Sequence, residues 1–371
     1  MKIGFIDVTA TVSFGGVQTA VWQLAMALHD LGHDVHVFGG KGNISPDLGG
    51  RAITIHRFAF TPREQVPNLG SRFRRIIERL SLARNARKTV TELDFDWLIL
   101  TKPFDFFWPW LMPKRSRTRF CFMSGGTDFF RGDRLLAKRI EAWVACSHFN
   151  AWQIQHHYKR FPEVIYNGVD IAHFQPGDST AMRRQLGITS QDFLLAFAGR
   201  LVGWKGLRIA IEALAQTGRK DIRLLIIGSG DAEMSLKALS ARLNLQEQVI
   251  FHGPVKHADL PAYYAASDAG VFPSIGDEAF GITIAEAMAC GIPVIGSHIG
   301  GIPEVIGNEE QSGLLVTPGS ASALAHAILT LQQQPEQALR MGRWARKRIV
   351  DRYTWQQSAE RLLTILEQRC G

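Results

Sequence analysis

Short apolar runs that alternate with longer segments of helical spacing constrain the fold of this chain more than any other feature. The first forty residues show the unit: an apolar run, the glycine turn FGG, a segment with apolar residues three or four positions apart, and a second apolar run. Runs that are apolar at nearly every position are typical of parallel strands buried on both faces. The pattern predicts an α/β chain of two doubly wound halves that join near residue 168. The runs are IGFIDV, VHVF, DWLIL, RFCFM and AWVAC in the first half, and FLLAFAG, RLLIIG, QVIFHG and AGVFP in the second.

Length and composition agree with two domains that have separate cores. The chain has 371 residues, 46% of them hydrophobic, and no stretch approaches the roughly 20 apolar residues that span a bilayer. The segment MKIGFIDV is interrupted by Asp7, which favours a first strand over a signal peptide. The cysteines are scattered without paired or metal-like spacing, which favours free thiols in a reducing cytoplasm. They are Cys121, Cys146, Cys290 and Cys370.

The net charge of +8 belongs entirely to the first half of the chain. Residues 1–170 hold 23 lysines and arginines against 15 aspartates and glutamates, whereas residues 171–371 hold 19 of each. Much of the excess lies in SRFRRIIERLSLARNARK and in the aromatic and then basic segment FDFFWPWLMPKRSR. Two interpretations stay open: a basic amphipathic helix beside an anionic membrane surface, or a solvated helix face. No nucleic acid partner is expected, because no recognisable binding module accompanies the charge.

Glycine-rich turns follow apolar runs in both halves. Gly15 and Gly16 follow the first run, and Gly228 and Gly230 follow RLLII. Such turns either let backbone N–H groups approach phosphate oxygens or are simply tight turns. The string GSGDAE lacks the third glycine of the dinucleotide fingerprint, so that motif is not predicted.

The string GRLVGWKG places two cations after the run FLLAFAG. Arg200 and Lys205 lie in a loop that Gly203 and Gly206 loosen. A cation pair at the carboxyl end of a parallel strand suits the binding of a diphosphate. The alternative is a pair of solvated loop cations.

Two acids lie eight positions apart in GDEAFGITIAEAMACGIPV, which predicts a helix that starts at Phe280 and Gly281 and stops at Gly291. Glu286 stands among apolar residues and needs a partner from the protein or from a ligand. Helical rise would separate it from Glu278 by roughly 12 Å. Paired glycosidase carboxylates stand about 5–9.5 Å apart. The spacing therefore predicts two acids that hold opposite ends of an extended ligand, such as a nucleotide diphosphate sugar; the alternative is a helix cap at Glu278 and a solvated Glu286.

Together these segments resemble the large family of retaining glycosyltransferases with the GT-B fold, the type that pairs a "glycosyltransferase family 4" domain with a "group 1" domain. The match is dense from about residue 160 to 320 and thinner before it. The matching strings are FGGVQ, VIYNGVDIAHFQP, FAGRLVGWKG, LLIIGSGD, LPAYYAASDAGVFPS, GDEAFGITIAEAMACGIPVIGSHIGGIPEVI and SGLLVTPG.

The resemblance implies an α/β GT-B fold in which two doubly wound, Rossmann-like domains face a central cleft. Residues 1–168 would bind the acceptor, and the final helix, within residues 355–371, would pack back on this domain. Residues 169–354 would bind the nucleotide-sugar. The family retains the anomeric configuration, with front-face attack assisted by the leaving phosphate, and needs no metal and no other cofactor.

The resemblance also implies a role for each matching position. Arg200 and Lys205 would bind the donor diphosphate and stabilise charge on the leaving nucleotide. Glu286 would hold the ribose hydroxyls, and Glu278 would contact hydroxyls of the donor sugar. The other donor-binding positions are Gly15, Gly16, Gly199, Val255 near the base, and Phe280, Gly281 and Ile282 with their backbone N–H groups.

One departure from the family pattern concerns the first domain. Many members carry a histidine that touches the donor sugar, and Gly125 of FCFMSGGTDFF stands in its place. Either Ser124 or Asp128 takes the contact, or activity is lower, or the acceptor completes the site; Asp128 is thus a candidate catalytic residue. His148 and the pair His156–His157 are interpreted as structural or solvent-facing.

A metal site is not expected. The string DFD, Asp94 to Asp96, is similar to the Asp-any-Asp motif that binds Mn²⁺ in unrelated glycosyltransferases, but it directly precedes the expected strand WLIL. His298 in GSHIGG is expected in a loop under the phosphates and not as a ligand.

The resemblance implies transfer of a sugar from a UDP- or GDP-sugar to a glycan or lipid-linked acceptor, and the basic first half suggests cell-envelope polysaccharide or lipopolysaccharide synthesis. The expected location is the cytoplasm, including the inner face of the cytoplasmic membrane. Two alternatives remain: a nucleotide-sugar epimerase or hydrolase on the same fold, and a non-catalytic module that binds sugar nucleotides or membrane glycans.

Overall fold

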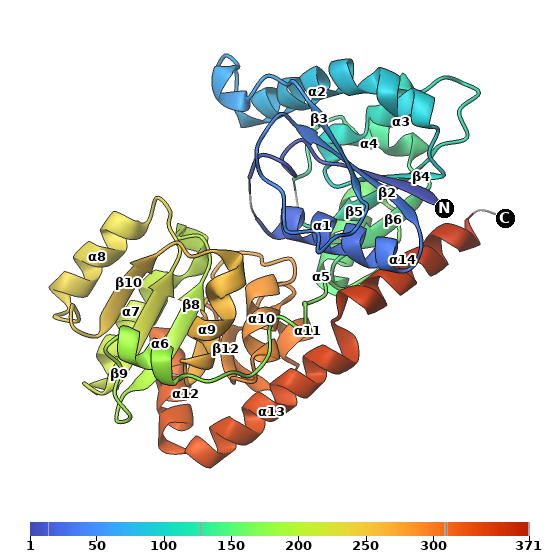
Figure 1. Ribbon diagram of the computed structural model, residues 1–371. Helices are drawn as coiled ribbons and strands as arrows, with labels where there is room; N and C mark the ends of the chain where they lie inside the picture. Colours follow the sequence, from blue (N-terminus) through green and yellow to red (C-terminus); the bar gives the residue numbers. More distant parts are fainter. Residues whose placement is uncertain (14, 127, 308, 310, 370–371) are drawn as a thin grey trace. The chain divides into compact units, whose positions relative to one another are not determined.

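The chain folds into two compact units, each built around a parallel sheet (Figure 1). The computed structural model describes residues 1–13, 15–126, 128–307, 309 and 311–369, so Phe14 of the FGG turn, Thr127 and Cys370 lie outside the described residues. Unit 1 comprises Met1–Gly168 and Trp355–Gly371, and unit 2 comprises Val169–Thr354. The α/β class with two doubly wound, Rossmann-like sheets is confirmed. Within the described chain, every helix is too short or too polar to cross a membrane.

The sheet of unit 1 has seven parallel strands in the order β3-β2-β1-β4-β5-β6-β7. The order reverses between β1 and β4, where Ile3 lies opposite Val35 on one side and Trp97 on the other. The strands are β1 (Lys2–Ile6), β2 (Asp34–Gly40), β3 (Thr54–Phe58), β4 (Trp97–Leu100), β5 (Arg119–Ser124), β6 (Ala142–Ala145) and β7 (Glu163–Val164).

Helices cover both faces of this sheet, which explains why its central strands are apolar at successive positions. In β4, Trp97 and Ile99 join one core cluster, and Leu98 and Leu100 join the other. The first cluster contains α1 and the second contains the inner side of α2. The helices are α1 (Gly16–Asp30), α2 (Ser71–Leu93), α3 (Trp108–Leu111), α4 (Asp133–Leu136), α5 (His148–Tyr158) and α14 (Trp355–Gln368), with 3₁₀ turns at Arg63–Gln65, Pro103–Asp105 and Ala137–Arg139.

Helix α14 returns from the end of the chain and lies beside α1 (Figure 1). Its apolar stripe includes Trp355, Leu362 and Leu366, which are buried in the same core cluster as Val21 and Leu24 of α1. The last helix therefore contributes to the core of unit 1, from which it is distant in sequence.

Unit 2 has six parallel strands in the order β10-β9-β8-β11-β12-β13. The order reverses between β8 and β11, and ligands of open α/β sheets bind at the carboxyl ends of the strands beside such a switch point. The strands are β8 (Phe193–Ala198), β9 (Ile222–Ile227), β10 (Val249–Gly253), β11 (Ala269–Phe272), β12 (Val294–Ser297) and β13 (Gly313–Val316). The helices are α6 (Thr180–Gln185), α7 (Leu207–Thr217), α8 (Glu233–Arg242), α9 (Leu260–Ala265), α10 (Ile282–Ala289), α11 (Ile302–Ile306), α12 (Ala321–Gln333) and α13 (Pro335–Arg352), with 3₁₀ turns at Gly203–Lys205 and His257–Asp259.

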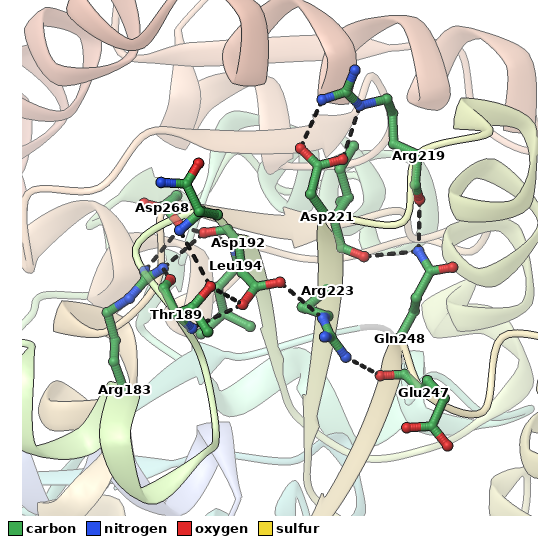
Figure 2. A network of polar contacts seen from close by, with 12 residues as sticks. Arg183, Thr189, Asp192, Leu194, Arg219, Asp221, Arg223, Glu247, Gln248 and Asp268 are labelled. Carbon is green, nitrogen blue, oxygen red and sulfur yellow. Dashed lines mark hydrogen bonds and ion pairs between the residues drawn. The ribbon is translucent and has the colours of Figure 1, made fainter.

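A polar network ties together the amino ends of the unit 2 strands (Figure 2). The carboxylate of Asp268, just before β11, accepts from the Leu194 N–H at 2.7 Å and from Arg183 at 3.1 Å. Asp192, just before β8, is 3.1 Å from the Arg223 guanidinium of β9. These bonds hold the amino ends of neighbouring strands together and leave the carboxyl edge to other residues.

Candidate functional site

The loops that follow β8 and β11 come together at the carboxyl edge of the unit 2 sheet. The N–H groups of Ile275 and Gly276 donate to the carbonyl oxygen of Trp204, at 2.8 and 3.2 Å. Gly206 (φ +72°) lies so close to the second loop that a Cβ there would be 1.9 Å from the Pro273 carbonyl oxygen. Glycine alone permits this approach, so the two loops form one continuous surface beside the switch point.

Lys205 and Glu278 form an ion pair across these two loops. Lys205 ends a 3₁₀ turn, and its ammonium lies 4.5 Å from the centre of the Trp204 ring. The two side chains are 16% and 17% exposed, so solvent and a ligand can reach them. The resemblance implies that Lys205 binds the donor diphosphate and that Glu278 contacts the donor sugar. The structure brings these two side chains into direct contact. A phosphate that binds Lys205 therefore shares the ammonium with Glu278.

The helix predicted for the GITIAEAMA segment is confirmed: it is α10, Ile282–Ala289. Gly281 is its N-cap with φ +98°, and no side chain caps it, so the alternative of Glu278 as the helix cap is wrong. The N–H groups of Ile284 and Ala285 donate to the Gly281 carbonyl oxygen, which leaves those of Ile282 and Thr283 without a partner inside the helix. They and the helix dipole favour an anion near Gly281.

A pair of glycines supports the segment that precedes α10. The Gly301 N–H donates to the Glu278 carbonyl oxygen at 2.7 Å. A Cβ on Gly300 (φ +62°) would be 2.4 Å from that oxygen, and one on Gly301 would be 2.3 Å from the Ala279 carbonyl oxygen. The Phe280 side chain is buried. The GG pair of the β12–α11 loop therefore fixes the backbone that carries Glu278.

Arg200 stands at the carboxyl end of β8 between two backbone contacts with the next loop. The Gly199 N–H donates to the Ile227 carbonyl oxygen at 3.0 Å, and the Leu201 N–H donates to the Ser229 carbonyl oxygen at 2.9 Å. The Arg200 side chain is exposed, and no described residue bonds to its guanidinium. Its five donors are available to a ligand oxyanion.

Packing accounts for the glycines of the string GSGDAE. A Cβ on Gly228 (φ +136°) would lie 1.9 Å from the Gly199 carbonyl oxygen, and one on Gly230 would lie 2.2 Å from that of Leu201. Both glycines therefore hold the β9–α8 loop against the segment that carries Arg200. The structure supports the tight-turn interpretation of these two positions.

Glu286 lies inside α10 and is 3% exposed, so the alternative of a solvated Glu286 is wrong. Its Oε1 accepts a hydrogen bond from Nε2 of His257 at 2.7 Å. Its Oε2 is buried and has no partner among the described residues. The acid thus has one partner from the protein and one oxygen without a partner.

His257 is the site residue that the sequence patterns missed. It begins the 3₁₀ turn His257–Asp259 after β10, two positions beyond Val255, which is half-buried. Burial alone would lower the pKa of His257, but the hydrogen bond to Glu286 and the charges of Glu286 and Asp170 outweigh burial and raise it. The available signal was an ionisable side chain just past the carboxyl end of the predicted strand QVIFHG, which is β10.

The glycine turn of unit 1 precedes α1, which begins at Gly16. Gly15 is the N-cap of this helix, with extended backbone and no side-chain cap. The contact of Gly15 and Gly16 with a donor remains a prediction.

Asp128 of unit 1 is held between two cations. Its Oδ1 accepts from Arg75 and its Oδ2 accepts from Lys102, each at 2.8 Å. Burial alone would raise the pKa of Asp128, but attraction and hydrogen bonds from Lys102 and Arg75 outweigh burial and lower the pKa to about 2. Asp128 is therefore an ionised carboxylate with both oxygens occupied, and a contact with a donor sugar would require one of these bonds to rearrange.

The segment at the position of the family histidine packs closely against α1. A Cβ on Gly125 would lie 2.9 Å from Cγ2 of Val17, so a side chain here requires Val17 to move. The Ser124 hydroxyl donates to the Gly126 carbonyl oxygen at 3.0 Å. Gly125 has no side chain to offer a donor sugar, and the Ser124 hydroxyl is engaged with the backbone of Gly126.

The basic segment of α2 divides between an inner and an outer face. Arg79 is buried and pairs with Asp105, and its Nη2 lies 3.6 Å from Oδ1 of Asp7. Arg84 and Arg87 are exposed. The expectation of a solvated or membrane-facing cationic helix is therefore wrong for Arg79, because an arginine at this register points into the unit.

The acids of DFD have structural partners. Asp96 accepts from the Lys2 N–H at 2.7 Å, and Asp94 pairs with Arg117 at 3.0 Å. Among the described residues, no three His, Cys, Asp or Glu side chains gather as a metal site would require. The structure supports the interpretation that these acids simply precede a strand, since β4 begins at Trp97.

The four histidines discussed in the sequence analysis lie in different environments. His157 pairs with Asp133 at 2.9 Å, and His156 stacks on Trp152. His148 lies against Tyr166. His298 is exposed in the β12–α11 loop, where its backbone N–H donates to the Val316 carbonyl oxygen.

Comparison with known proteins agrees with the class that the fold and the loops define. The Anabaena protein HepE, solved in complex with UDP and glucose, superposes with a TM-score of 0.83 over 99% of this chain and 99% of its own, at 24% identity. That similarity shows the GT-B fold of two Rossmann-like domains.

Two family models match the chain in succession. The model described as Glycosyltransferase Family 4 matches residues 14–173, and the model described as Glycosyl transferases group 1 matches residues 178–348. The chain belongs to the glycosyltransferase family that combines these two domains.

Curated relatives cover part of the chain. A D-inositol 3-phosphate glycosyltransferase of Segniliparus rotundus is 32% identical over 241 residues, which is 62% of this chain and 53% of the relative. A GDP-mannose-dependent monoacylated alpha-(1-6)-phosphatidylinositol monomannoside mannosyltransferase of Corynebacterium glutamicum is 32% identical over 216 residues, 55% of this chain and 56% of the relative. The chain thus spans about half the length of these relatives.

Proposed function

We propose that this protein moves a sugar from a UDP- or GDP-sugar to a glycan or lipid-linked acceptor, with retention of the anomeric configuration and without a metal. The observation that carries the proposal is a set of polar groups beside the β8/β11 switch point. They are an exposed Arg200 with no partner among the described residues, the Lys205–Glu278 pair, and the buried carboxylate of Glu286, whose Oε2 has no partner in the same part of the chain. A relative named for GDP-mannose supports GDP as the base of the donor, and a neighbour solved with UDP supports UDP.

In this proposal each group meets one part of the donor. Arg200 and Lys205 bind the diphosphate and stabilise the charge that develops on the leaving nucleotide. The N-terminus of α10 at Gly281 adds positive potential. Glu286 accepts a hydrogen bond from the ribose, and Glu278 accepts one from the sugar while it remains close to Lys205.

Unit 1 is proposed to bind the acceptor. It carries the whole excess of positive charge, and α2 exposes Arg84 and Arg87 beside the exposed apolar side chain of Leu80. Such a surface suits an anionic membrane that presents a lipid-linked glycan. Cell-envelope polysaccharide or lipopolysaccharide synthesis on the inner face of the cytoplasmic membrane is the setting that this chemistry fits.

Thermal-shift titration with UDP, GDP and their sugars tests the donor site, because a ligand that binds only the folded state raises its stability. We expect one nucleotide series to raise Tm, and Glu286→Ala to reduce the shift. No shift with any of these ligands would contradict the assignment. The nucleotide-sugar that binds is then incubated with candidate acceptors. Release of free sugar without transfer would favour the epimerase or hydrolase alternative. Binding of the nucleotide-sugar without hydrolysis or transfer would favour the non-catalytic binding module.

Vesicle flotation tests the membrane surface. The doubly substituted Arg84→Gln, Arg87→Gln variant should bind less to vesicles with anionic lipid than the wild type does. The matched control neutralises two exposed arginines of α13 in unit 2, Arg343→Gln and Arg352→Gln. Equal binding by both variants would exclude α2 as the contact.

A further inference from the structure

We propose that His257 is a positioning residue that holds Oε1 of Glu286, so that Oε2 alone is presented to the ribose hydroxyls of the nucleotide. The inference rests on the proposed function and explains how the same site recognises ribose. His257 belongs to a different element from Glu286, and it lies 29 residues earlier in the chain.

The surroundings of Glu286 leave few ways to satisfy a carboxylate. Its neighbours Ala285, Ala287 and Met288 are fully buried, and a buried acid without partners is destabilising. The His257 N–H at 2.7 Å satisfies one oxygen. The other, Oε2, is buried and lacks a partner among the described residues. A ligand hydroxyl that donates to Oε2 would remove this penalty.

The His257 side chain is 45% exposed, and on its other side the ring packs against Phe174. Its ring lies 5.1 Å from the centre of the Phe174 ring. The Phe174 carbonyl oxygen accepts from the Arg346 guanidinium, which also donates to the Ala289 carbonyl oxygen, at 2.8 Å, at the end of α10. The wall behind the imidazole is therefore tied to the helix that carries Glu286, and the His257–Glu286 distance depends on both.

The pair has an electrostatic consequence for an anionic ligand. Groups that interact electrostatically with the pair are Asp170 on His257, and Tyr264 and Cys290 on Glu286. Burial opposes charge on His257, but Glu286 and Asp170 outweigh it and raise the pKa of His257. A protonated His257 neutralises Glu286, so the affinity for a nucleoside diphosphate should fall as pH rises through that raised pKa.

The test measures binding of UDP and GDP, each beside a deoxy analogue that lacks both ribose hydroxyls. His257→Ala should weaken the binding nucleotide about tenfold more than it weakens the deoxy analogue, since loss of the His257 charge affects both ligands and only the nucleotide loses a well-oriented hydrogen bond to a charged group. His257→Gln keeps an N–H donor, so it should restore affinity and abolish the pH dependence. His252→Ala is the matched control, because His252 lies at the end of β10 but bonds to Tyr263.

Three outcomes would overturn the inference. Equal loss for nucleotide and deoxy analogue would mean that His257 acts only structurally, and no loss would mean that it does not act on the site. Additive effects in the His257→Ala, Glu286→Ala double variant would mean that the two residues work independently. Wild-type protein that binds neither UDP nor GDP would instead overturn the proposed function itself.

Discussion

Lys205 and Glu278 give each other a charge partner while remaining accessible, and this contact links the phosphate and sugar ends of the proposed donor. Neither side chain is deeply buried, so their attraction is moderated by solvent. The pair holds two flexible side chains where a ligand can use both. The effect of substituting each member should therefore differ.

Lys205→Ala should weaken nucleotide binding about ten- to a hundredfold, because the phosphate loses a cation and gains an unpaired Glu278. Glu278→Gln should leave nucleotide affinity unchanged or tighter and reduce discrimination among donor sugars. Calorimetric titration with the nucleotide and with its sugars measures both effects. Arg208→Ala, which affects an exposed pair on α7, serves as the control. A loss for Glu278→Gln as large as that for Lys205→Ala would contradict this division of roles.

The pair of His257 and Glu286 should also make folding stability depend on pH. Because the pKa of His257 is raised above its ordinary value of 6.5, the unfolded chain holds this proton less tightly than the folded chain. The stabilisation is complete below pH 6.5 and is lost as pH rises through the raised pKa. Denaturant unfolding of wild type and His257→Gln without ligand should give a difference that shrinks over this range. A difference that grows with pH would contradict the assignment.

At the scale of elements, α2 shows how one helix can be basic on the outside and ionic on the inside. Arg79 is 5% exposed and lies between Asp105 and Asp7. The composition of this helix suggests a uniformly solvated cationic surface. Helical register decides instead which arginines face the sheet, since positions three or four apart share a face.

Arg79→Ala should lower the free energy of unfolding by about 3–5 kcal/mol, because it leaves two buried acids without their cation. Arg84→Ala on the exposed side of the same helix should change it by no more than about 0.5 kcal/mol. Chemical denaturation of both variants measures the difference. Similar values for the two would show that the buried ion pair contributes nothing beyond a surface charge.

Strand prediction succeeded where burial on both faces makes a strand apolar throughout. The runs IGFIDV, DWLIL and FLLAFAG became β1, β4 and β8. The strands β3, β7, β12 and β13 were not predicted. Of these, β3, β7 and β13 are edge strands, whereas β12 is central and buried but has only four residues. In β3 the residues are exposed or half-buried and the string TIHRF carries polar side chains.

At the scale of the whole molecule, the chain closes unit 1 with its last helix. Leu362 of α14 is fully buried in the core cluster that contains α1 and β1. The stability of this unit therefore depends on residues from both ends of the sequence, although unit 2 lies between them in the chain.

Leu362→Ala should lower the free energy of unfolding by about 2–5 kcal/mol through the cavity it leaves. Leu339→Ala on the exposed side of α13 should be nearly neutral, since Leu339 is 62% exposed. Calorimetry gives both values, and nucleotide binding below the transition should be retained in each. A neutral Leu362→Ala would argue against the docking of α14 on this core.

The sequence alone determined the α/β class, the helix of the GITIAEAMA segment, and an acid in it that needs a partner, because apolar periodicity and burial act over a few neighbouring residues. Only the tertiary structure decided which groups meet. Lys205 and Glu278 are 73 residues apart, and His257 and Glu286 are 29 apart. Their contacts depend on strand order at a switch point and on glycines that let two loops touch. Those are properties of packing in space that no local pattern of residues contains.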